Sequence, residues 1–535
     1  MSAGTVIFSL RFFKSGRMLA VNLRISQIIH KYFTFYTHMA CYVSEHNTYS
    51  KCSVSTGGSN MTRLPKRRIQ MRLAFMGSLL ATAMYLTEAH ANPTAYTAAN
   101  TTAAANIAPA AADKGTNTAP NTLMDLYKRS GIRVGGWING GATFNPSHID
   151  GFNGPVTFND QANRFQLNQF NVFIERAVVA EGSKWDFGGR VDVLFGTDAI
   201  FTQAYGVPAF DVNSGQPLSR SNWDLDLCCA STRYYGIAIP QAYGEVYVPI
   251  GNGLNVKVGH FYTPIGYESV PAPNNFFYSH AYTMQYGEPF THTGALGNYY
   301  VNKNVMLMGG TTTGSATGGW DGGFDKQLGN WGGLAGITWT SDDKGSSANI
   351  SGSYAQTSTR SNEPWGMYSI VLKHRITPKT NFVFQHDHGY AGGVLLNGVI
   401  QNAEWYGINT HTYYDITPDL SIGVRAEWFR DRDGFRVFSP GRVAAATNNQ
   451  GLSYALGSGR FGNATSAPAD YYAVTLGMNW KAARTLKMDW KAMRQFNVRP
   501  NVRYDAVDGL HGLDYRPFGG HKDQVVMSLD FMLPF

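Results

Sequence analysis

The last stretch of the chain, Lys522 to Phe535, constrains the fold more than any other segment. Every second position from Val525 to Phe535 is apolar, and the positions between them hold Val526, Ser528, Asp530 and Met532. A period of two indicates a β-strand, because successive side chains of a strand point to opposite faces. Chain ends of soluble domains are usually loose and polar. We therefore predict a strand with one face toward lipid and one toward water. The alternative is the buried edge strand of a soluble β-sandwich.

The end of this strand carries a second signal. Its apolar face finishes on Phe531, Leu533 and the terminal Phe535. A terminal aromatic residue after alternating apolar residues resembles the signal by which bacterial outer-membrane barrels are recognised for assembly. We predict that these three residues are an assembly signal and that the barrel-assembly machinery is a partner.

The same alternation recurs along the chain from Ile132 onward. We predict sixteen strands at these approximate positions: 132–145, 163–179, 184–196, 238–249, 254–263, 291–301, 304–314, 331–340, 347–357, 364–376, 380–391, 403–415, 419–430, 469–481, 485–496 and 522–535. A basic side chain that faces lipid at mid-membrane would cost about 2–4 kcal/mol. The charged faces of these strands should therefore point inward.

The connections between the predicted strands alternate in length. Short turns follow the even-numbered strands, for example Gly251-Asn252-Gly253, Thr417-Pro418 and Ala482-Ala483-Arg484, and most of them carry turn-forming residues. Generally longer loops follow the odd-numbered strands, including 197–237, 431–468 and 497–521. We predict an all-β fold, a transmembrane antiparallel up-and-down β-barrel of sixteen strands, with short periplasmic turns and long extracellular loops.

Composition agrees with a barrel. Charged residues make up only 15% of the chain, whereas Gly (59), Tyr (30) and Phe (31) are abundant. Long soluble helices would need more Leu, Glu and Lys. No run of eighteen apolar residues follows Ala91, so we expect no transmembrane helix. A closed barrel satisfies its backbone polar groups without one.

The net charge of +8 comes from the amino-terminal leader. Residues 1–91 hold eleven Lys and Arg against two Glu, a net charge of +9, so the remaining chain carries −1. The basic pI therefore gives no reason to expect nucleic acid as a partner of the mature protein.

Residues 61–91 have the parts of a secretory signal peptide. A basic region precedes the apolar core Leu73–Leu86, and Ala89-His90-Ala91 forms a cleavage site of the small-x-small kind. About sixty residues precede this signal. We interpret residues 1–60 as an upstream extension from a start assigned too early, with translation beginning at Met61 or Met71. A genuine long leader is the alternative.

Between the signal and the barrel lies a segment of low complexity. Residues 92–120 are mainly Ala, Asn, Thr and Pro and cannot bury a core. We predict a flexible periplasmic segment over residues 92–130, followed by the outer-membrane barrel over residues 131–535.

Sixteen strands enclose a channel too wide for side chains alone to fill, so a water-filled lumen is expected. The predicted pore-lining residues are Arg190, Asp192, Glu245, Lys257, Lys373, Asp387, Arg425, Glu427, Lys487, Asp489 and Lys491. They have both signs and are open to two interpretations, a mutually compensated solvated wall or a set of selectivity residues. Their pattern predicts neither anion nor cation preference.

The third long loop, Pro264 to Phe290, differs from the other loops. It is rich in aromatic residues and proline, which makes free movement in water unfavourable. We predict that it narrows the pore, with these residues at the constriction: Tyr267, Glu268, Phe276, Phe277, His280, Tyr282, Tyr286 and Glu288. The alternative is a loop packed on the rim or against a neighbouring subunit.

Four stretches carry a resemblance to a known family. They are NRFQLNQFNVFIERA (163–177), WDFGGRVDVLFGTDA (185–199), IPQAYGEVYVPIGNGLNVKVGHFYTPIGYE (239–268) and NNFFYSHAYTMQYGEPFTHTGAL (274–296). They resemble the putative beta-barrel porin type 2 family, described as OmpL-like. The similarity spans about Gly131 to Phe535. The resemblance implies an outer-membrane barrel with porin activity and supplies no catalytic or substrate-binding residues.

Other chemistry has weak support in the sequence. His386 and His388 share one strand face without a clear third ligand, so we predict no metal site. Cys228 and Cys229 could form a strained disulfide or remain two unused thiols. Ser279-His280 is the nearest hint of a hydrolase, but adjacency in sequence does not make a catalytic triad. No nucleotide-binding loop is present. We predict no catalytic residues and no cofactor.

The function that we predict is a passive outer-membrane diffusion channel for small hydrophilic solutes or ions. A structural or surface-binding barrel with a closed lumen is the second hypothesis, and an outer-membrane hydrolase is a remote third. The expected partners are outer-membrane lipid, lipopolysaccharide, the permeating solutes and, by analogy with other sixteen-stranded porins, two further copies in a homotrimer.

Overall fold

The computed structural model describes residues 7–14, 17–24, 130–147, 151–180, 182–202, 235–313, 331–356, 363–396, 399–437, 467–486, 493 and 495–535. The chain divides into two units, Met1–Ala74 and Phe75–Phe535. In the first unit, β1 (Ile7–Lys14) and β2 (Arg17–Arg24) pair antiparallel. The predicted signal peptide and residues 92–129 lie outside the described residues.

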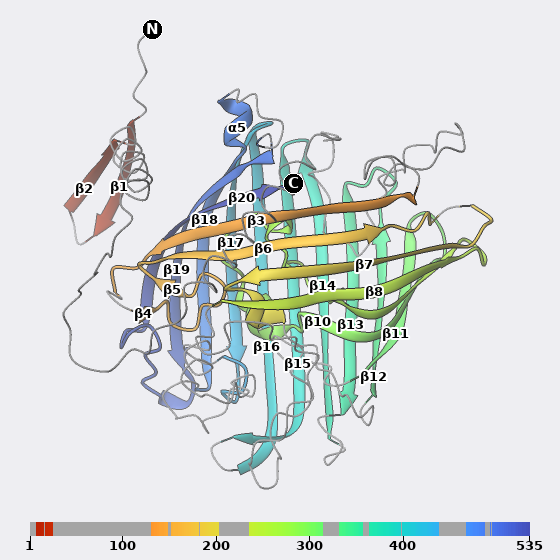
Figure 1. Ribbon diagram of the computed structural model, residues 1–535. Coiled ribbons are helices and arrows are strands. Elements are labelled where there is room, and N and C mark those ends of the chain that lie inside the picture. Colours follow the sequence, from red (N-terminus) through yellow and green to blue (C-terminus); the bar gives the residue numbers. More distant parts are fainter. Residues whose placement is uncertain are drawn as a thin grey trace, which may run out of the picture. The chain divides into compact units, whose positions relative to one another are not determined.

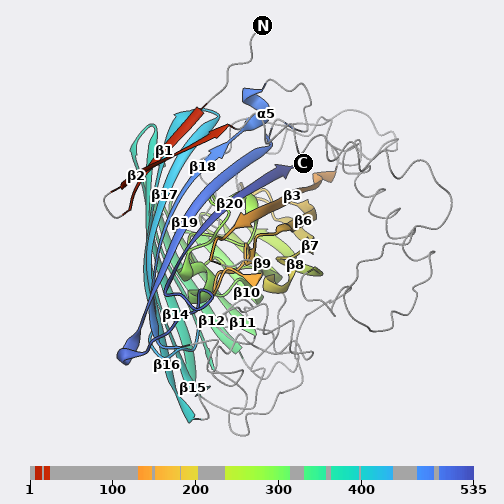
Figure 2. The same ribbon diagram turned by 90° about the vertical axis from the view of Figure 1, so that its left-hand side faces the viewer.

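In the second unit, sixteen strands pair antiparallel into one closed barrel (Figures 1 and 2). The strands are β3 (Ile132–Phe144), β6 (Phe165–Arg176), β7 (Asp186–Gly196), β8 (Gly236–Val248), β9 (Leu254–Tyr262), β10 (Thr291–Tyr300), β11 (Val305–Thr313), β12 (Trp331–Thr340), β13 (Ser346–Gln356), β14 (Pro364–Thr377), β15 (Thr380–Leu396), β16 (Val399–Thr417), β17 (Leu420–Asp431), β18 (Ala469–Trp480), β19 (Asn497–Gly509) and β20 (Asp523–Pro534). The predicted all-β, sixteen-stranded antiparallel barrel is confirmed.

Strand tilt is visible in Figure 1, where β3, β6, β7 and β8 run across the direction of β14 to β17 on the opposite wall. Closing a sheet requires such a tilt. Among the described residues, no helix is long and apolar enough to cross a membrane.

The chain ends close the barrel. β20 pairs with β3, and the terminal Phe535 exchanges two backbone hydrogen bonds with Gly136, at 2.9 and 3.0 Å. The Phe535 ring lies 6.3 Å from the Phe170 ring of β6. The alternating carboxy-terminal strand therefore completes the sheet and leaves neither β3 nor β20 as an open edge.

The two faces of each strand differ in chemistry. On β17, Ile422 and Val424 are about two-fifths exposed on the outward face, whereas Arg425 and Glu427 are buried on the inward face. The outward side chains of β20 are the predicted apolar set, and Asp530 points inward. An outward apolar band beside inward polar side chains is typical of a transmembrane β-barrel, in which the apolar band faces lipid.

Aromatic residues border this band. Trp185, Tyr414 and Tyr472 are 60%, 43% and 45% exposed near strand ends, as expected for interfacial girdles. β15 and β16 have 17 and 19 residues, whereas a tilted strand needs about 9–11 residues to cross a bilayer. The hairpin of β15 and β16 therefore extends beyond the membrane.

One predicted strand is wrong. The fifteenth strand was expected at 485–496, but the structure forms it at β19, Asn497–Gly509. The predicted turn 482–484 is the short helix α5 (Ala482–Thr485), and the first half of the predicted loop 497–521 is strand β19. Residues 485–496 also alternate, with Leu486, Met488 and Trp490 between charged residues, so the period of two alone did not separate this stretch from 497–509. The alternation of β19 is nevertheless clear, with Asn497, Arg499, Asn501, Arg503 and Asp505 all buried on one face.

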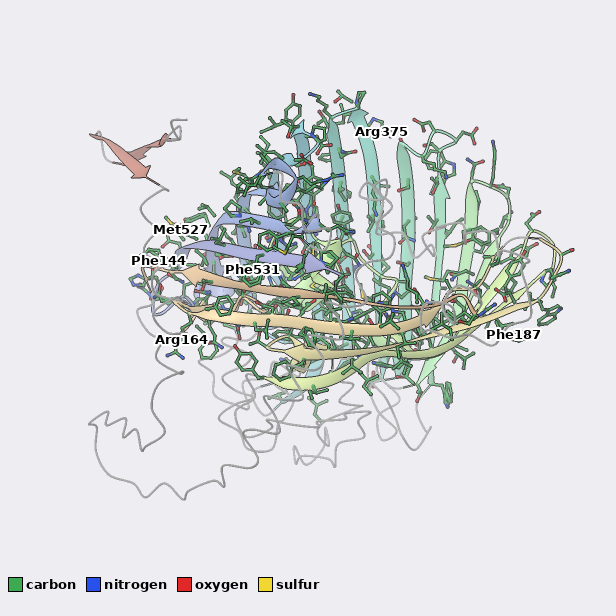
Figure 3. All side chains as sticks on the ribbon, turned by 45° about the horizontal axis from the view of Figure 1, so that its top comes forward. Phe144, Arg164, Phe187, Arg375, Met527 and Phe531 are labelled. Atoms are coloured by element: carbon green, nitrogen blue, oxygen red, sulfur yellow. The ribbon has the colours of Figure 1, made fainter. Side chains whose placement is uncertain are left out.

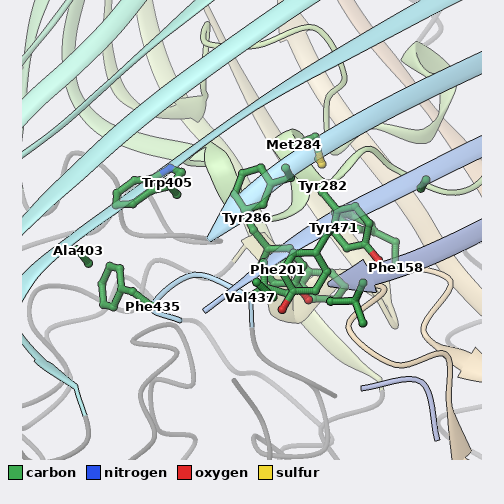
Figure 4. Packing of buried hydrophobic residues seen from close by; sticks show 14 of the residues in the cluster. Phe158, Phe201, Tyr282, Met284, Tyr286, Ala403, Trp405, Phe435, Val437 and Tyr471 are labelled. Carbon is green, nitrogen blue, oxygen red and sulfur yellow. The ribbon is translucent and has the colours of Figure 1, made fainter. Parts of the chain in front are cut away.

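The largest buried apolar cluster fills part of the loop-side half of the barrel (Figure 4). Inward-facing Trp405, Phe429 and Tyr471 contribute to it from the wall. Loop residues complete it: Phe158, Phe201, Tyr282, Tyr286, Phe435, Tyr515 and Phe518. Residues from five separate loops thus share one core inside the barrel wall.

Candidate functional site

The third loop, residues 263–290 between β9 and β10, lies inside the barrel. It contains the short helical turns η2 (Ala272–Asn274) and η3 (Thr283–Gly287). Its contacts reach inward-facing side chains of β6, β15, β16, β17 and β19. For example, Gln169 of β6 donates to the Val270 carbonyl at 2.7 Å, and Trp405 of β16 donates to the Gly287 carbonyl at 3.0 Å. The loop therefore crosses from one wall of the interior toward another and does not rest on the rim.

Three arginines of the wall hold the backbone of this loop. We call Arg425 of β17 with Arg499 and Arg503 of β19 the arginine row. Each donates from Nη1 to a loop carbonyl: Arg425 to Ser279 at 2.7 Å, Arg499 to Asn275 at 2.6 Å and Arg503 to His280 at 2.8 Å. Without these arginines, the three loop carbonyl groups would lack hydrogen-bond partners inside the barrel. The three hydrogen bonds therefore determine the path of the loop.

Carboxylates neutralise the arginine row. Arg425 pairs with Glu268 of the loop at 2.7 Å and with Glu427 at 3.2 Å. Arg503 pairs with Asp505 at 2.7 Å and with Glu427 at 3.1 Å. Burial acts to raise the pKa of Glu268, but the Arg425 guanidinium outweighs it and holds that pKa well below the usual range. Glu268 is therefore ionised and binds the loop to β17.

Two carboxyl groups meet at the other end of the loop. Gln385 of β15 donates from Nε2 to Glu288 and, at 2.9 Å, to Asp387. Burial raises the pKa of Glu288 well above its usual range, and the adjacent Asp387 carboxylate raises it further. The Glu288 carboxyl is thus the protonated member that approaches Asp387, because two adjacent buried charges of one sign would repel.

Aromatic side chains occupy the turn side of the loop. The Phe276 ring lies 4.6 Å from Tyr413 and 4.9 Å from Phe277, and Tyr267 meets His411 edge-on at 4.8 Å. Burial raises the pKa of Tyr267 to about 12, so its hydroxyl stays neutral. These rings pack the loop against β16.

The remaining predicted loop residues anchor its loop-side surface. The Tyr282 hydroxyl donates to Asp505 at 3.0 Å, and Tyr286 donates to the Pro155 carbonyl of the first long loop at 2.5 Å. His280 lies 3.4 Å from Glu268. The third loop is therefore bound both to the barrel wall, through Asp505, and to the first long loop, through Pro155.

A second group of charges lies on the opposite wall. Arg190 of β7 pairs with Asp192 at 2.5 Å and with Glu175 of β6 at 3.4 Å. The Lys257 ammonium of β9 lies 4.3 Å from the Tyr243 ring. Asn255 donates to Glu245 at 2.9 Å on the same wall. Arg190, Glu245 and Lys257 face inward and are partly accessible, so they can meet a solute in the lumen, whereas Asp192 is buried beneath Arg190.

The chain matches one protein family over residues 131–535, described as "Putative beta-barrel porin-2, OmpL-like". The chain belongs to this porin family. Its match covers the whole barrel, and it confirms the resemblance seen in the sequence. No curated relative matches the chain.

Solved outer-membrane proteins have similar structures. The channel DcaP of Acinetobacter baumannii is 12% identical, with 76% of this chain and 97% of that chain covered and a TM-score of 0.42. OprB of Pseudomonas putida is 11% identical over 76% of this chain and 94% of that chain, with a TM-score of 0.42. OmpF of Salmonella typhi, in complex with daunomycin, is 10% identical over 76% and 97%, with a TM-score of 0.41.

The predicted pore-lining residues of this porin separate into two sets. Asp387, Arg425 and Glu427 lie against the third loop and are buried there. Arg190, Asp192, Glu245 and Lys257 lie on the opposite wall. Lys373 of β14 faces inward, with its ammonium 5.0 Å from the Tyr267 ring. Lys487, Asp489 and Lys491 lie between α5 and β19 in the chain, outside the described residues, and β18 pairs directly with β19 in the barrel.

Two of the three arginines in the row, Arg499 and Arg503 of β19, were not among the predicted site residues. Arg499, Arg503 and Asp505 were placed in a loop because of the misplaced strand. Asp530 was recognised as inward, but its pairing with Arg499, at 3.1 Å, was not expected. The polar period of two over 497–505 was the signal that could have found them.

The other chemical candidates do not converge. His386 and His388 lie on the outward face of β15, and the described residues contain no group of three metal-ligating side chains. Ser279 and His280 lie inside the barrel, bound to Arg425 and Glu268 respectively, and not on the outer wall where a lipase site was considered. Cys228 and Cys229 lie outside the described residues.

Proposed function

We propose that this porin is a passive diffusion channel for small hydrophilic solutes or ions. In this proposal the third loop limits the size of the permeating solute. The inward charged side chains on β7, β8, β9 and β14 contact the solute as it crosses the lumen. No covalent step or cofactor is required, because movement down a gradient needs only a wetted and shaped passage.

The observation that carries the proposal is the third loop inside the barrel. Three wall arginines bind its carbonyls, and Gln385 and Trp405 hold its return to β10. A loop fixed in this way divides the lumen and leaves partly accessible charged side chains on the opposite wall. Such an arrangement supports a narrowed passage whose charge preference depends on few residues.

The test is single-channel conductance of residues 92–535 inserted in a planar bilayer, first in symmetric KCl and then across a salt gradient. Stable current steps are expected, and the reversal potential reports the ion preference. Absence of steps, with insertion verified by protease protection, would contradict the diffusion channel.

A second candidate function is a surface-binding barrel with a closed lumen. It is favoured by the buried apolar cluster that joins five loops to the wall. In the conductance experiment this candidate predicts silence from correctly inserted protein. Lipid hydrolysis assayed on the same preparation tests our proposal that the protein is not an enzyme.

The processing and assembly of the chain are also proposals. We propose cleavage after Ala91, recognition of Phe531, Leu533 and Phe535 by the barrel-assembly machinery, and a homotrimer in the membrane. Amino-terminal sequencing tests the first, and light scattering of the detergent-solubilised protein tests the last.

A further inference from the structure

We propose that the outward edge of β3, β6 and β20 at the loop side is a binding site for a phosphorylated glycolipid of the outer leaflet. This site lies outside the barrel wall, and its existence does not depend on the function of the lumen.

The site is a hollow of about 580 Å³ where β3 ends and β6 begins. It is lined by Ala142, Thr143, Phe144, Asn145, Pro146, Asn163, Arg164 and Phe165. A backbone hydrogen bond from Thr143 to the Arg164 carbonyl, at 3.3 Å, holds the two strand ends together. The hollow is thus part of the strand framework and not of a long loop.

The floor of the hollow is apolar and exposed. Phe144 and Phe165 of its lining are each 57% exposed, and beside the hollow Met527 of β20, directly opposite Phe144 in the register, is 45% exposed. The Phe531 ring stacks on Phe165 at 6.1 Å. Figure 3 shows Phe144, Met527 and Phe531 along this edge of the barrel, with Arg164 beside them. Acyl chains can lie against this surface, because it continues the lipid-facing band.

The rim of the hollow carries a positive charge. Arg164 is exposed, and no carboxylate among the residues that the structure describes pairs with it. A planar guanidinium forms paired hydrogen bonds with phosphate oxygens. An anionic head group attached to acyl chains therefore complements both parts of the site.

The height of the hollow in the membrane fits a head group. Tyr472 and Tyr504 are outward, 45% exposed, and continue the loop-side aromatic girdle toward β20. Tyr504 lies opposite Val525, which is two residues before Met527 on β20. The hollow is thus near the level of the girdle, where the phosphates of outer-leaflet glycolipids lie.

The test is native mass spectrometry of the full chain in detergent, titrated with diphosphorylated lipid A. We expect one tightly bound lipid per barrel, and binding weaker by on the order of 10-fold or more in Arg164→Gln, because a charge-assisted hydrogen bond is lost. The matched control is Arg516→Gln, an exposed arginine in the loop before β20 that already pairs with Asp514 at 2.9 Å. Binding by this control should equal that of the wild type.

Phe144→Ala supplies an independent variant. It keeps the arginine and should also weaken lipid A binding, whereas inorganic phosphate should not compete with the lipid. Equal binding by Arg164→Gln and wild type would overturn the proposal, as would equal affinity for phosphatidylethanolamine. Dissociation of an oligomer by Arg164→Gln, without any bound lipid in the wild type, would assign the hollow to a second copy of the chain and also overturn it.

Discussion

At the residue scale, buried charges inside the barrel are paired between loop and wall. The side chains of Arg425 and Glu268 are 0% and 4% exposed, so their pairing offsets a large desolvation cost. Arg375, which Figure 3 labels, forms a contrasting pair with Asp343 at a turn, 3.7 Å apart, and their side chains are 45% and 73% exposed. Exposed pairs of this kind contribute little. Position, and not charge alone, decides which arginines matter.

Replacing Arg425 should therefore destabilise the barrel strongly. We expect Arg425→Met to lower the free energy of unfolding by about 3–5 kcal/mol, because Glu268 and the Ser279 carbonyl lose their partner while buried. Arg375→Ala should cost less than about 1 kcal/mol. Urea unfolding in detergent micelles measures both, and equal losses would contradict the assigned roles.

Glu288 should make stability fall as pH rises. Burial and Asp387 raise the pKa of Glu288 in the folded protein. The contribution of its protonated carboxyl to the free energy of unfolding is therefore complete below the pKa of the unfolded chain, and it is lost as the pH rises through the raised pKa of the folded protein. Glu288→Gln should remove this loss and be more stable than wild type at alkaline pH. The opposite sign is expected for Glu268, whose lowered pKa makes its contribution disappear as pH falls. Unfolding midpoints across pH measure both, and parallel curves for wild type and Glu288→Gln would contradict the first.

At the element scale, the third loop and β19 depend on each other. β19 supplies Arg499 and Arg503, and the loop supplies the carbonyls that these guanidinium groups bind. An interior loop needs such partners because its backbone groups have no sheet neighbours. The third loop therefore needs β19 to keep its position, and the two arginines of β19 need the loop carbonyls as hydrogen-bond partners.

Deleting residues 271–286 should enlarge the passage. The deletion removes η2, most of η3 and the three carbonyls bound by the arginine row, so less of the loop crosses the interior and conductance should rise. Single-channel recording measures the conductance. Unchanged conductance in a folded barrel would show that the loop does not narrow the pore.

The corrected fifteenth strand can be tested from its lipid face. Val502 is 44% exposed in the middle of β19. Val502→Lys should cost about 2–4 kcal/mol, whereas Asp508→Lys, near the loop end of the strand, should cost about 0–1 kcal/mol. Unfolding measurements in lipid bilayers compare the two. Equal costs would argue against a membrane-spanning β19.

At the scale of the whole molecule, the barrel depends on the joint between its first and last strands. A Cβ atom on Gly136 would meet the Asn171 carbonyl and, at 2.6 Å, the Phe535 ring. The absence of a side chain at this position lets the terminal residue close the sheet. Closure leaves the sheet without an unpaired edge. The stability of every other strand depends on this closure.

Gly136→Val should therefore impair closure. We expect a loss of about 1–3 kcal/mol from overpacking and a smaller fraction of folded barrel on unheated gels. Gly244→Val in β8 is the matched control, since a Cβ atom there meets nothing within 4 Å. Equal folding of the two variants would contradict a special role for the joint.

The sequence by itself determined the class of fold. The apolar alternation of residues 522–535 and the alternation of short turns with long loops can be seen in the sequence locally. A period of two follows from strand geometry alone. Fifteen of the predicted strands overlap strands of the barrel, and β12 has the predicted bounds. The fifteenth strand was misplaced because residues 485–496 alternate in the same way as residues 497–509, and a local period cannot choose between two such stretches.

Only the tertiary structure decided the arrangement of the interior. The aromatic content of the third loop suggested that it would avoid water, but the rim and the lumen satisfied that requirement equally. Contacts between residues far apart in the chain, such as Arg425 with Glu268 and Gln385 with Glu288, decided between them. These pairings form only when barrel closure brings β15, β17 and the loop together. The local alternation of a strand does not predict which distant residues will meet in this way.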